Sequence, residues 1–395
     1  MNWLSQIVAV TAVTLRSIPQ RFGSSVVAII GIGGVVIVFT AVLSIADGFR
    51  AAMRGTGDPQ TVIVMRSGSD TEMTSGFSGE EARLVTEAPF IEQGPEGAHA
   101  SPELFVIVGH PLKRSGTDAN VPLRGLTPIA LKVRPKVRLI EGRMFTPGTS
   151  EIIVGHAASR QFMGLTVGSS VKWGEASWQV VGIFDAGGSV SESEIWCDAK
   201  VLQPVYRRGN SYQSVYVRLT SADKFQEFKD SLTTNPRLNV SVVREPDYYA
   251  QQSQVMQTII RSIGFAIAAL MGLGAVFGAL NTMYSAVANR TREIATLRAL
   301  GFGGSPVVIS VLIEAVLLSL VGGLIGGGLA WAAFDGYQTA TMNFQSFSQV
   351  AFAFKVGPDL LARGLTYAVI MGLLGGLFPA IRAARMPVVT ALRQL

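Results

Sequence analysis

Apolar residues gather in four long runs along the chain, at residues 24–46, 262–284, 307–334 and 364–381. A helix needs about 20 consecutive, mainly apolar residues to cross the hydrocarbon core of a bilayer. The fourth run falls short of that length and depends on flanking residues. A cleavable secretory signal has an apolar stretch of only about 7–15 residues, so the first run is interpreted as a membrane anchor. The pattern predicts four membrane-spanning helices.

The segment before the first run, residues 1–23, is amphipathic. Apolar side chains such as Trp3 and Leu4 lie near its start, and Arg16 and Arg21 lie near its end. This arrangement is typical of a helix that rests in the membrane interface. We therefore expect an interfacial helix ahead of the first span.

Residues 47–261 form the one long region without such a run, and its pattern mixes short alternating and helical stretches. Its ends, 47–54 and 248–261, are expected to extend the neighbouring spans as stalk helices. Strands are predicted at residues 61–65, 104–108, 151–154, 171–173, 178–184, 215–219 and 240–243, helices at 80–87 and 222–232, and loops at 67–79 and 114–120. The predicted fold class is a membrane protein with four transmembrane α-helices and a large α+β extracytoplasmic domain inserted between helices 1 and 2. Residues 335–363 are expected to form a short extracytoplasmic loop.

The net charge of +6 is concentrated in three segments between and beyond the spans, residues 1–23, 285–306 and 382–395. Their charged residues are Arg16, Arg21, Arg290, Arg292, Arg298, Arg382, Arg385 and Arg393 against Glu293. Loops rich in arginine and lysine stay in the cytoplasm. Both termini are therefore predicted to be cytoplasmic, and residues 47–261 to lie on the opposite side. The basic excess reports topology, and no nucleic-acid partner is predicted.

No motif in the sequence supplies an active site. The phosphate-binding pattern G-x-x-x-x-G-K-[ST] is absent, as are G-x-S-x-G, H-E-x-x-H and C-x-x-C. Cys197 is the single cysteine, so no intrachain disulfide can form, and His99, His110 and His156 lack metal-ligand spacing. Acids in polar contexts of the large domain are expected to be solvated, namely Glu80, Glu81, Glu92, Glu96, Glu192 and Glu194. We expect no catalytic, cofactor or metal site in the chain.

Small residues spaced four apart mark three of the predicted spans. They are Gly274 and Gly278, Gly322 and Gly326, and Gly372 and Gly376. Such spacing lets helices approach closely in lipid. The sequence leaves open whether these glycines pack the helices of one chain together or join two chains.

Glu314 is an acid inside the third apolar run. An ionisable group inside a span is costly and marks a partner or a pathway. Pairing with Arg290, Arg292 or Arg298 would anchor the preceding loop, and a part in coupling is the alternative. Ion transport is disfavoured because the four runs hold no other acid. Arg290 also precedes Glu293 by three residues, so these two can pair across one helical turn.

Residues 289–301, with the sequence NRTREIATLRALG, separate the second and third apolar runs. A helix here places Ile294, Leu297 and Leu300 on one stripe, and Gly301 suits the end of that helix. An apolar stripe flanked by arginines fits a groove on a partner protein. A positively charged loop resting on lipid headgroups is the alternative interpretation.

Several stretches resemble one family, the MacB/FtsX-like permeases of ABC transporters, also called type VII. They are residues 281–301, Ile313-Glu314-Ala315 with the glycines of 322–328, residues 379–393, and the sequences EGRMF at 141–145 and VVGIF at 180–184. The resemblance runs nearly end to end and is looser between residues 54 and 140. The chain differs from MacB in lacking a fused ATPase domain.

The resemblance implies a non-catalytic permease subunit in a bacterial inner membrane, in a homodimer or heterodimer bound to two copies of a separate cytoplasmic ATPase. ATP and Mg would be bound by that ATPase, and no cofactor by this chain. Nucleotide-driven motion would pass through the spans to the extracytoplasmic domain, a mechanism called mechanotransmission. The implied ATPase-coupling residues are Arg290, Arg292, Glu293, Ile294, Leu297 and Arg298, with Glu314 as a brace from the third span.

Three functions follow as alternatives. The first is export or extraction of a lipid, lipoprotein, peptide or drug, with or without a periplasmic adaptor protein. The second is an FtsX-like regulatory module that passes ATPase motion to an extracytoplasmic partner and transports nothing. The third is a membrane scaffold without an ATPase. The sequence names no substrate.

Overall fold

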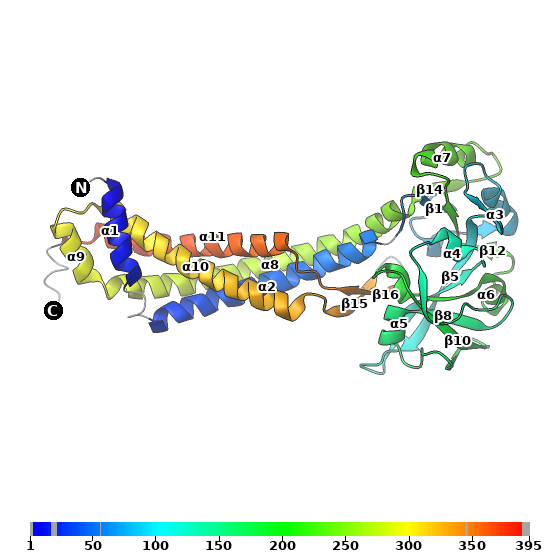
Figure 1. Ribbon diagram of the computed structural model, residues 1–395, viewed down its shortest axis with the longest axis horizontal. Helices are drawn as coiled ribbons and strands as arrows, with labels where there is room; N and C mark the ends of the chain where they lie inside the picture. Colours follow the sequence, from blue (N-terminus) through cyan, green and yellow to red (C-terminus); the bar gives the residue numbers. More distant parts are fainter. Residues whose placement is uncertain (1–2, 17–21, 56, 344–346, 389–395) are drawn as a thin grey trace. The chain divides into compact units, whose positions relative to one another are not determined.

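The computed structural model describes residues 3–16, 22–55, 57–343 and 347–388 (Figure 1). These residues divide into two compact units. The helical unit comprises Met1–Asp47, Ile259–Tyr337 and Phe354–Leu395, and the sheet unit comprises Gly48–Thr258 and Gln338–Ala353. Arg21 and Arg393, two of the arginines assigned above to the cytoplasm, lie outside the described residues.

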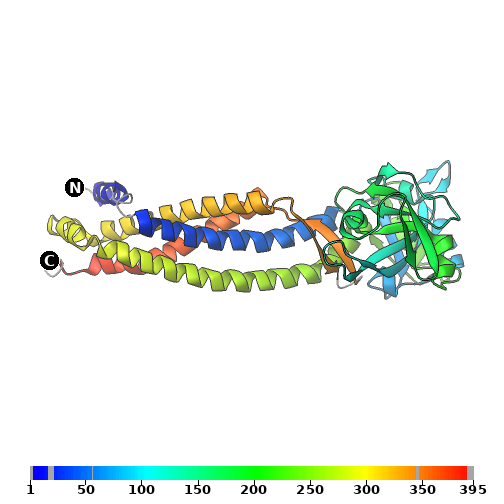
Figure 2. The ribbon, with the colours of Figure 1, turned by 90° about the horizontal axis from the view of Figure 1, so that it is seen from below.

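Six helices contribute to the helical unit. They are α1 (Trp3–Arg16), α2 (Phe22–Gly55), α8 (Glu245–Ala288), α9 (Thr291–Ala299), α10 (Gly304–Phe334) and α11 (Pro358–Arg385). Four of them, α2, α8, α10 and α11, are long and apolar enough to cross a membrane, which confirms the predicted number of spans. These four run side by side (Figure 2). α2 and α8 also continue through the two segments predicted as stalk helices.

α11 is longer than the apolar run that predicts it. Gly357 precedes the helix in an extended conformation, Pro358 occupies its first turn and Asp359 follows. Proline at the first helical position loses no intrahelical hydrogen bond, and an acid in the first turn interacts favourably with the helix dipole. Polar flanks thus extend the short fourth run to a helix of 28 residues.

Glycines bring α10 close to its neighbours. A methyl group added at Gly326 would lie against the carbonyl oxygen of Gly33 in α2, and one at Gly322 would lie 2.8 Å from the carbonyl oxygen of Ile29. On α11, a methyl group at Gly372 would lie 2.5 Å from Ser319 Oγ. These helices therefore meet backbone to backbone, as small residues in membrane helices allow.

The remaining predicted packing glycines fall into two groups. Gly376 faces Ala315 of α10, because a methyl group added at Gly376 would lie 2.6 Å from Ala315 Cβ. Gly274 and Gly278 of α8 are exposed and have no atom of the described chain within 4 Å of that position. Within the helical unit, α8 instead packs through Ala279, which faces Gly375 of α11.

The sheet unit is built on a ten-stranded sheet in the order β14-β1-β13-β5-β6-β11-β8-β10-β7, with β9 paired to β10. Its strands are β1 (Thr61–Arg66), β5 (Ala100–Pro111), β6 (Asp118–Leu126), β7 (Arg138–Gly142), β8 (Glu151–Gly155), β9 (Ser170–Trp173), β10 (Ala176–Asp185), β11 (Ile195–Asp198), β13 (Ser214–Arg218) and β14 (Val240–Arg244). Most neighbours are antiparallel, and β8–β10 and β6–β11 are parallel. The long strand β5 pairs with β13 on one side and with β6 on the other, so it lies in the middle of the sheet.

Short helices and 3-10 turns connect the strands of the sheet. The helices are α3 (Gly79–Thr86), α4 (Ala130–Val133), α5 (His156–Gln161), α6 (Ala199–Val205) and α7 (Phe225–Thr233), with 3-10 turns η2 (Glu72–Thr74), η3 (Val190–Ser193) and η4 (Ala222–Lys224). Two-stranded pairs are β2 (Phe77–Ser78) with β12 (Ser211–Tyr212), and β3 (Gln93–Gly94) with β4 (Gly97–Ala98). One apolar core contains Trp178, Phe162 and Leu202, and another contains Phe77, Phe228 and Leu232.

Every predicted strand overlaps an observed one, and the strands predicted at residues 171–173 and 178–184 pair antiparallel as β9 and β10. The sequence analysis misses β6, β7 and β11, and the predicted loop at 114–120 overlaps the start of β6. β6 contains Pro122, Arg124 and Gly125, residue types that disfavour a strand assignment. Pairing along β5, from Leu104–Gly125 to Pro111–Asp118, nevertheless holds it in the sheet.

The segment predicted as a short loop, residues 335–363, contains a β-hairpin. β15 (Gln338–Asn343) pairs antiparallel with β16 (Ser348–Ala353), and both strands belong to the sheet unit. Val350 and Phe352 are buried, and the edge of the Phe352 ring meets Phe49. Alternate burial along β16 is the period-two signal of a strand with one buried face.

The close approach of α2 and α10 predicts a position-specific effect of glycine replacement. Gly326→Leu should destabilise the full chain by roughly 1–3 kcal/mol or more, because the new side chain has no space beside Gly33. Gly328→Leu, on the same helix, should leave stability unchanged or higher, since Gly328 is exposed and nothing lies within 4 Å of its methyl position. Thermal unfolding of the detergent-solubilised chain measures both. Equal melting temperatures for the two variants would contradict the described packing.

Candidate coupling site

α9 is the helix that the sequence predicts between the second and third spans. It ends at a glycine, because Gly301 has a φ of 90° and its N–H donates to the Arg298 carbonyl oxygen at 3.1 Å. The N–H of Phe302 donates to the Leu297 carbonyl oxygen at 3.2 Å. A left-handed residue just beyond a helix is inexpensive for glycine. Gly301 thus turns the chain toward α10.

Arg290, at the start of α9, contacts three elements of the helical unit. Its Nε donates to Glu293 Oε2 at 3.0 Å, and its Nη2 donates to Thr14 Oγ1 of α1 at 3.1 Å. Its Nη1 lies 3.5 Å from Glu314 Oε2 of α10. Thr14 Oγ1 also lies 2.6 Å from Ser310 Oγ of α10. One guanidinium group therefore ties α9 to both α1 and α10.

The contact between Arg290 and Glu314 explains the acid in the third apolar run. Of the three arginines that the sequence offers as partners, the structure pairs Arg290 with this carboxylate, which is 2% exposed. Breaking a buried ion pair by removing one member typically costs about 3–5 kcal/mol, because the other charge stays buried. The pair fixes the start of α9 against the side of α10.

The inner face of α9 packs on the helical unit's own residues. Ile294 is 6% exposed and belongs to a cluster with Val287 of α8, Val311 of α10 and Ala380 of α11. Leu297 is half-buried. The stripe of Ile294, Leu297 and Leu300 was predicted to bind a partner. Its first residue, Ile294, instead packs in an apolar core of this chain.

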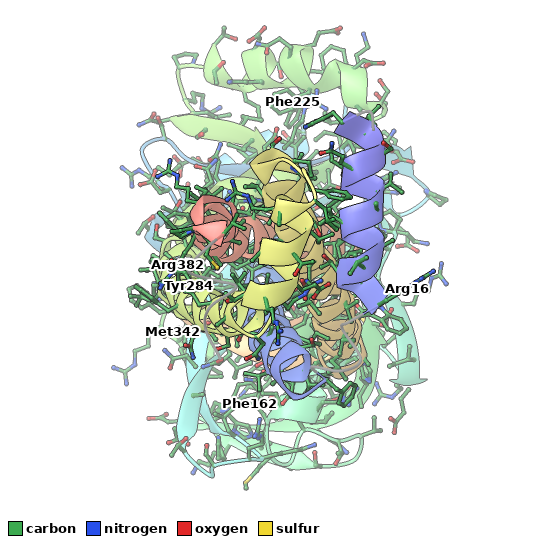
Figure 3. The ribbon with its side chains drawn as sticks, turned by 90° about the vertical axis from the view of Figure 1, so that its left-hand side faces the viewer. Arg16, Phe162, Phe225, Tyr284, Met342 and Arg382 are labelled. Atoms are coloured by element: carbon green, nitrogen blue, oxygen red, sulfur yellow. The ribbon has the colours of Figure 1, made fainter. Side chains whose placement is uncertain are left out.

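Arg298 fixes the other end of α9 to α11. Its Nη1 donates to the carbonyl oxygens of Ala384 and Met386, at 2.5 and 3.1 Å. A cation is favourable at the C-terminal end of a helix, where carbonyl groups lack partners. Nearby, the Arg382 guanidinium lies 5.5 Å from the centre of the Tyr284 ring, and both residues are labelled in Figure 3.

The opposite side of α9 is exposed. Arg292, Thr296, Ala299 and Leu300 share that side, and Leu300 is 72% exposed. We call these four residues the outer face of α9. Of the seven predicted coupling residues, Arg292 lies on this face, while Arg290, Glu293, Ile294, Arg298 and Glu314 make the internal contacts described above. The structure thus separates residues that anchor α9 from residues that a partner can reach.

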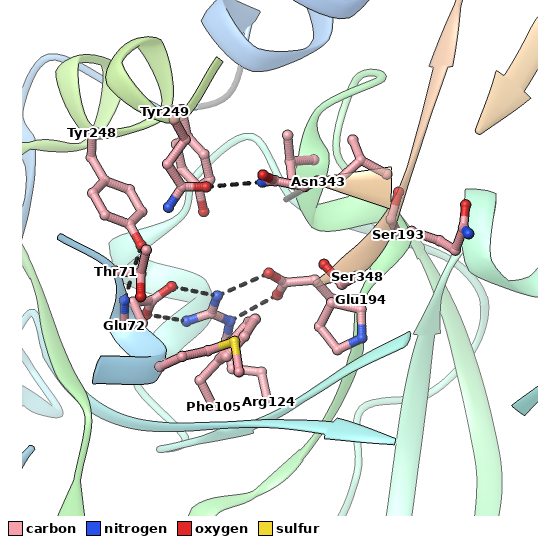
Figure 4. A pocket seen from close by; sticks show the side chains of 16 residues that line it. Thr71, Glu72, Phe105, Arg124, Ser193, Glu194, Tyr248, Tyr249, Asn343 and Ser348 are labelled. Carbon is pink, nitrogen blue, oxygen red and sulfur yellow. Dashed lines mark hydrogen bonds and ion pairs between the residues drawn. The ribbon is translucent and has the colours of Figure 1, made fainter. Parts of the chain in front are cut away.

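A second group of buried charges lies in the sheet unit (Figure 4). Arg124 of β6 donates to both oxygens of Glu194, at 2.8 and 2.9 Å, and to both oxygens of Glu72, at 2.7 and 3.0 Å. It also donates to Glu103 at 3.0 Å, and Arg134 binds Glu103 at 2.6 and 2.7 Å. We call these five residues the arginine cluster. All are buried.

A small pocket beside the arginine cluster joins distant parts of the sheet unit. Tyr248 and Gln252 of α8 line it together with Asn343 of β15 and Val350 of β16. Asn343 Nδ2 donates to Gln252 Oε1 at 3.1 Å. No prediction from the sequence includes this cluster, although a charge inside an otherwise apolar strand, such as Arg124 after Leu123, is a signal for it.

Comparison with known proteins decides the family. Residues 25–235 match the MacB-like periplasmic core domain, and residues 265–388 match the FtsX-like permease C-terminal domain. The chain belongs to the MacB/FtsX-like family of ABC transporter permeases. The four apolar helices and the periplasmic-type domain place this permease in the inner membrane.

Its relatives include proteins named as ATP-binding/permease proteins and proteins named as permeases. A macrolide export ATP-binding/permease protein MacB of Nitrosomonas europaea is 24% identical over 389 residues, covering 92% of this chain and 55% of that protein. The permease thus spans about half the length of that MacB. An uncharacterized ABC transporter permease, YknZ of Bacillus subtilis, is 24% identical over 411 residues, covering 98% of this chain and 96% of that protein.

Solved structures of two related domains are also similar. The periplasmic region of MacB from Actinobacillus actinomycetemcomitans covers 52% of this chain and 95% of its own, with a TM-score of 0.37 and 14% identity. The extracellular domain of YknZ covers 47% of this chain and all of its own, with a TM-score of 0.36 and 19% identity.

Two acids of the permease that the sequence predicts to be solvated are buried. Glu194 belongs to the arginine cluster, and Glu192 is 7% exposed. The prediction is wrong for both because η3 and the residue after it fold into the sheet unit. Burial is the main cause that raises the pKa of Glu192, and the neighbouring Asp185 carboxylate adds to it against two backbone hydrogen bonds.

The arginine cluster predicts a large effect of removing its central cation. Arg124→Met should destabilise the permease by roughly 3–5 kcal/mol, because buried carboxylates lose their partner. Arg143→Met is the matched control, since the side chain of Arg143 is 56% exposed and pairs with Glu151. Its loss should cost no more than about 1 kcal/mol. Denaturant unfolding of the full chain, followed by tryptophan fluorescence, measures both, and similar losses for the two variants would refute a special role of the cluster.

The same cluster predicts a dependence of stability on acid. Burial alone would raise the pKa of Glu72, but the charge and hydrogen bonds of Arg124 and the Ser214 hydroxyl outweigh it and hold the pKa below its ordinary value of 4.5. The ionised carboxylate therefore stabilises the fold above about pH 4.5, and this contribution is lost as the pH falls through the lower folded-state pKa.

Glu72→Gln should consequently have a lower melting temperature than wild type near about pH 7, and the difference should shrink toward about pH 3. Thermal unfolding across that range tests this. A difference that stays constant with pH would show that Glu72 does not contribute through its charge.

Proposed function

We propose that this permease couples ATP hydrolysis on a separate cytoplasmic ATPase to movement of its extracytoplasmic domain, the sheet unit. The movement would drive export or extraction of a lipid, lipoprotein, peptide or drug by mechanotransmission. The observation that carries the proposal is the attachment of α9 at both ends, by Arg290 to α1 and α10 and by Arg298 to α11.

Those attachments suit α9 to transmit force. A helix held only by its flanking loops would tilt under load without moving its neighbours. Arg290 and Arg298 instead connect α9 to three other helices, and Ile294 adds apolar contacts with α8, α10 and α11. A partner that displaces the outer face of α9 would therefore displace the ends of the spans as well.

The lengths of the spans support transmission beyond the bilayer. α8 has 44 residues, which corresponds to about 66 Å of helix. The hydrocarbon core is only about 30 Å thick. α2 and α8 are each continuous from residues of the helical unit into residues of the sheet unit. Displacement at one end of either helix would reach the sheet unit without an intervening flexible linker.

The proposal assigns the chemistry to other subunits. The sequence contains no phosphate-binding motif, and the match to the ABC transporter permease YknZ covers 96% of that protein. ATP and Mg would be bound by two copies of the ATPase, beneath a dimer of permease subunits. The exposed glycines Gly274 and Gly278 of α8 are available for the contact between those subunits.

The outer face of α9 provides the test. Leu300→Asp and Arg292→Glu, singly and together, should reduce co-purification of the ATPase by at least about tenfold, since both side chains are exposed and reach no core. Ile140→Asp is a matched control in the sheet unit, where Ile140 is 54% exposed. All four variants should insert in the membrane and melt as wild type does. Normal ATPase binding by the double variant would overturn the assignment of α9 as the docking helix.

A regulatory function is the second candidate, because residues 265–388 match the FtsX-like permease C-terminal domain. Vesicles that contain the reconstituted permease and the ATPase distinguish export from regulation. Export predicts ATP-dependent transfer of a substrate and stimulation of ATP turnover by it. Regulation predicts coupling of ATP turnover to an extracytoplasmic protein without any transfer.

A further inference from the structure

Three side chains that are far apart in the sequence meet at one edge of the sheet unit. His156 is the first residue of α5 and directly follows β8, and Asp185 is the last residue of β10. β8 and β10 are parallel neighbours, with Gly155 opposite Phe184. The carboxyl ends of parallel strands share an edge, where α/β proteins commonly bind ligands. Glu192 of η3 reaches the same place.

The chain holds Glu192 in a defined orientation. The N–H groups of Ala186 and Gly188 donate to its Oε1 at 2.9 and 2.6 Å. Gly187 and Gly188 have φ of 66° and 76°, a left-handed conformation that glycine adopts without strain. Among the described residues, no backbone N–H donates to Oε2. The turn between β10 and η3 therefore fixes one carboxylate oxygen of Glu192, and this side chain has two close neighbours.

Those neighbours are a second carboxylate and an imidazole. One ligand atom from each of His156, Asp185 and Glu192 lies within 4.8 Å of the other two. In the part of the chain that the structure describes, no lysine or arginine forms an ion pair with either carboxylate. The His156 ring makes no hydrogen bond there either. Two facing carboxylates and an imidazole therefore converge with no lysine or arginine paired to them among the described residues.

We propose that His156, Asp185 and Glu192 bind a divalent first-row transition-metal ion of the Zn²⁺ or Mn²⁺ class. One imidazole nitrogen and two carboxylate oxygens are ligands that such ions accept, whereas Ca²⁺ and Mg²⁺ prefer oxygen alone. Metal–ligand bonds of about 2.1 Å place two ligands at most about 4.2 Å apart. The three side chains therefore need to close by only several tenths of an ångström. His156 and Asp185 are half-buried, so the site is open to solvent.

An ion bound to Glu192 would restrain the two residues that follow it, Ser193 and Glu194. Ser193 follows Glu192, and its Oγ accepts from the N–H of Ala351 in β16 at 2.9 Å. Glu194 comes next and binds Arg124. Figure 4 shows Glu194 bonded to Arg124, with Ser193 in the lining of the same pocket. Fixing Glu192 would thus restrain the segment that holds both the hairpin β15–β16 and the cluster. This inference is independent of ATPase coupling.

Metal titration of the full chain tests the site. The detergent-solubilised protein, freed of any polyhistidine tag and treated with a chelator, is titrated with Zn²⁺, Mn²⁺ and Co²⁺ by calorimetry and, for Co²⁺, by visible absorption. Wild type should bind one equivalent of Zn²⁺ or Mn²⁺. His156→Ala, Asp185→Asn and Glu192→Gln should each weaken that binding by more than about tenfold.

Matched controls separate the site from other histidines and acids. His110→Ala and Asp118→Asn lie elsewhere in the sheet unit and should bind as wild type does. Asp185→Asn removes one of two facing like charges, so it should stay folded, and its unfolding curve without metal checks this. Absence of stoichiometric binding to wild type, or undiminished binding by folded Asp185→Asn and Glu192→Gln, would overturn the proposal.

Discussion

One guanidinium group holds the segment between the second and third spans to the helical unit. Arg290 pairs with Glu314, an acid that an apolar helix would otherwise not tolerate, and with Thr14 of α1. The arrangement explains three separate features of the sequence by one contact: the acid in the third run, the basic loop before it, and the amphipathic helix at the start. Burial makes the contact decisive, because each charge without the other would be strongly disfavoured.

The sheet unit also depends on a buried arginine, and this one has more carboxylate partners. Arg124 satisfies Glu72 and Glu194 with paired hydrogen bonds, and the guanidinium group also lies over the Phe105 ring. Charge-assisted, bidentate bonds of this kind have strict geometric requirements. They favour a single arrangement of η2, β6 and the residue after η3, because any other arrangement would leave a buried charge without its partner. Both units therefore place a buried arginine where several elements must keep one relative position.

Local signals predict the elements of this permease well, and long-range pairing explains what they miss. Apolar run length locates the four spans, Gly301 locates the end of α9, and the spacing of Arg290 and Glu293 predicts their pairing. The arginine cluster was not predictable, because Arg124 meets its partners through strand order and not through spacing. Burial of Ile294 was missed for a related reason: a periodic pattern identifies an apolar face but not the surface that covers it. The hairpin β15–β16 was missed because its place between two apolar runs favoured a connecting loop over a part of the sheet unit.

The contact of α2 with α10 has a mechanical consequence. At Gly33, Gly322 and Gly326 the two helices meet mainly through backbone atoms, and the Ile32 side chain also lies against Gly322. Interdigitated leucines resist axial displacement, since each must change rotamer before it can enter the next gap. A contact between smooth backbones lacks that barrier, and small sliding of packed helices is one of the known modes of domain motion. Close packing of the first and third spans through glycines therefore places few side-chain barriers against small axial displacement.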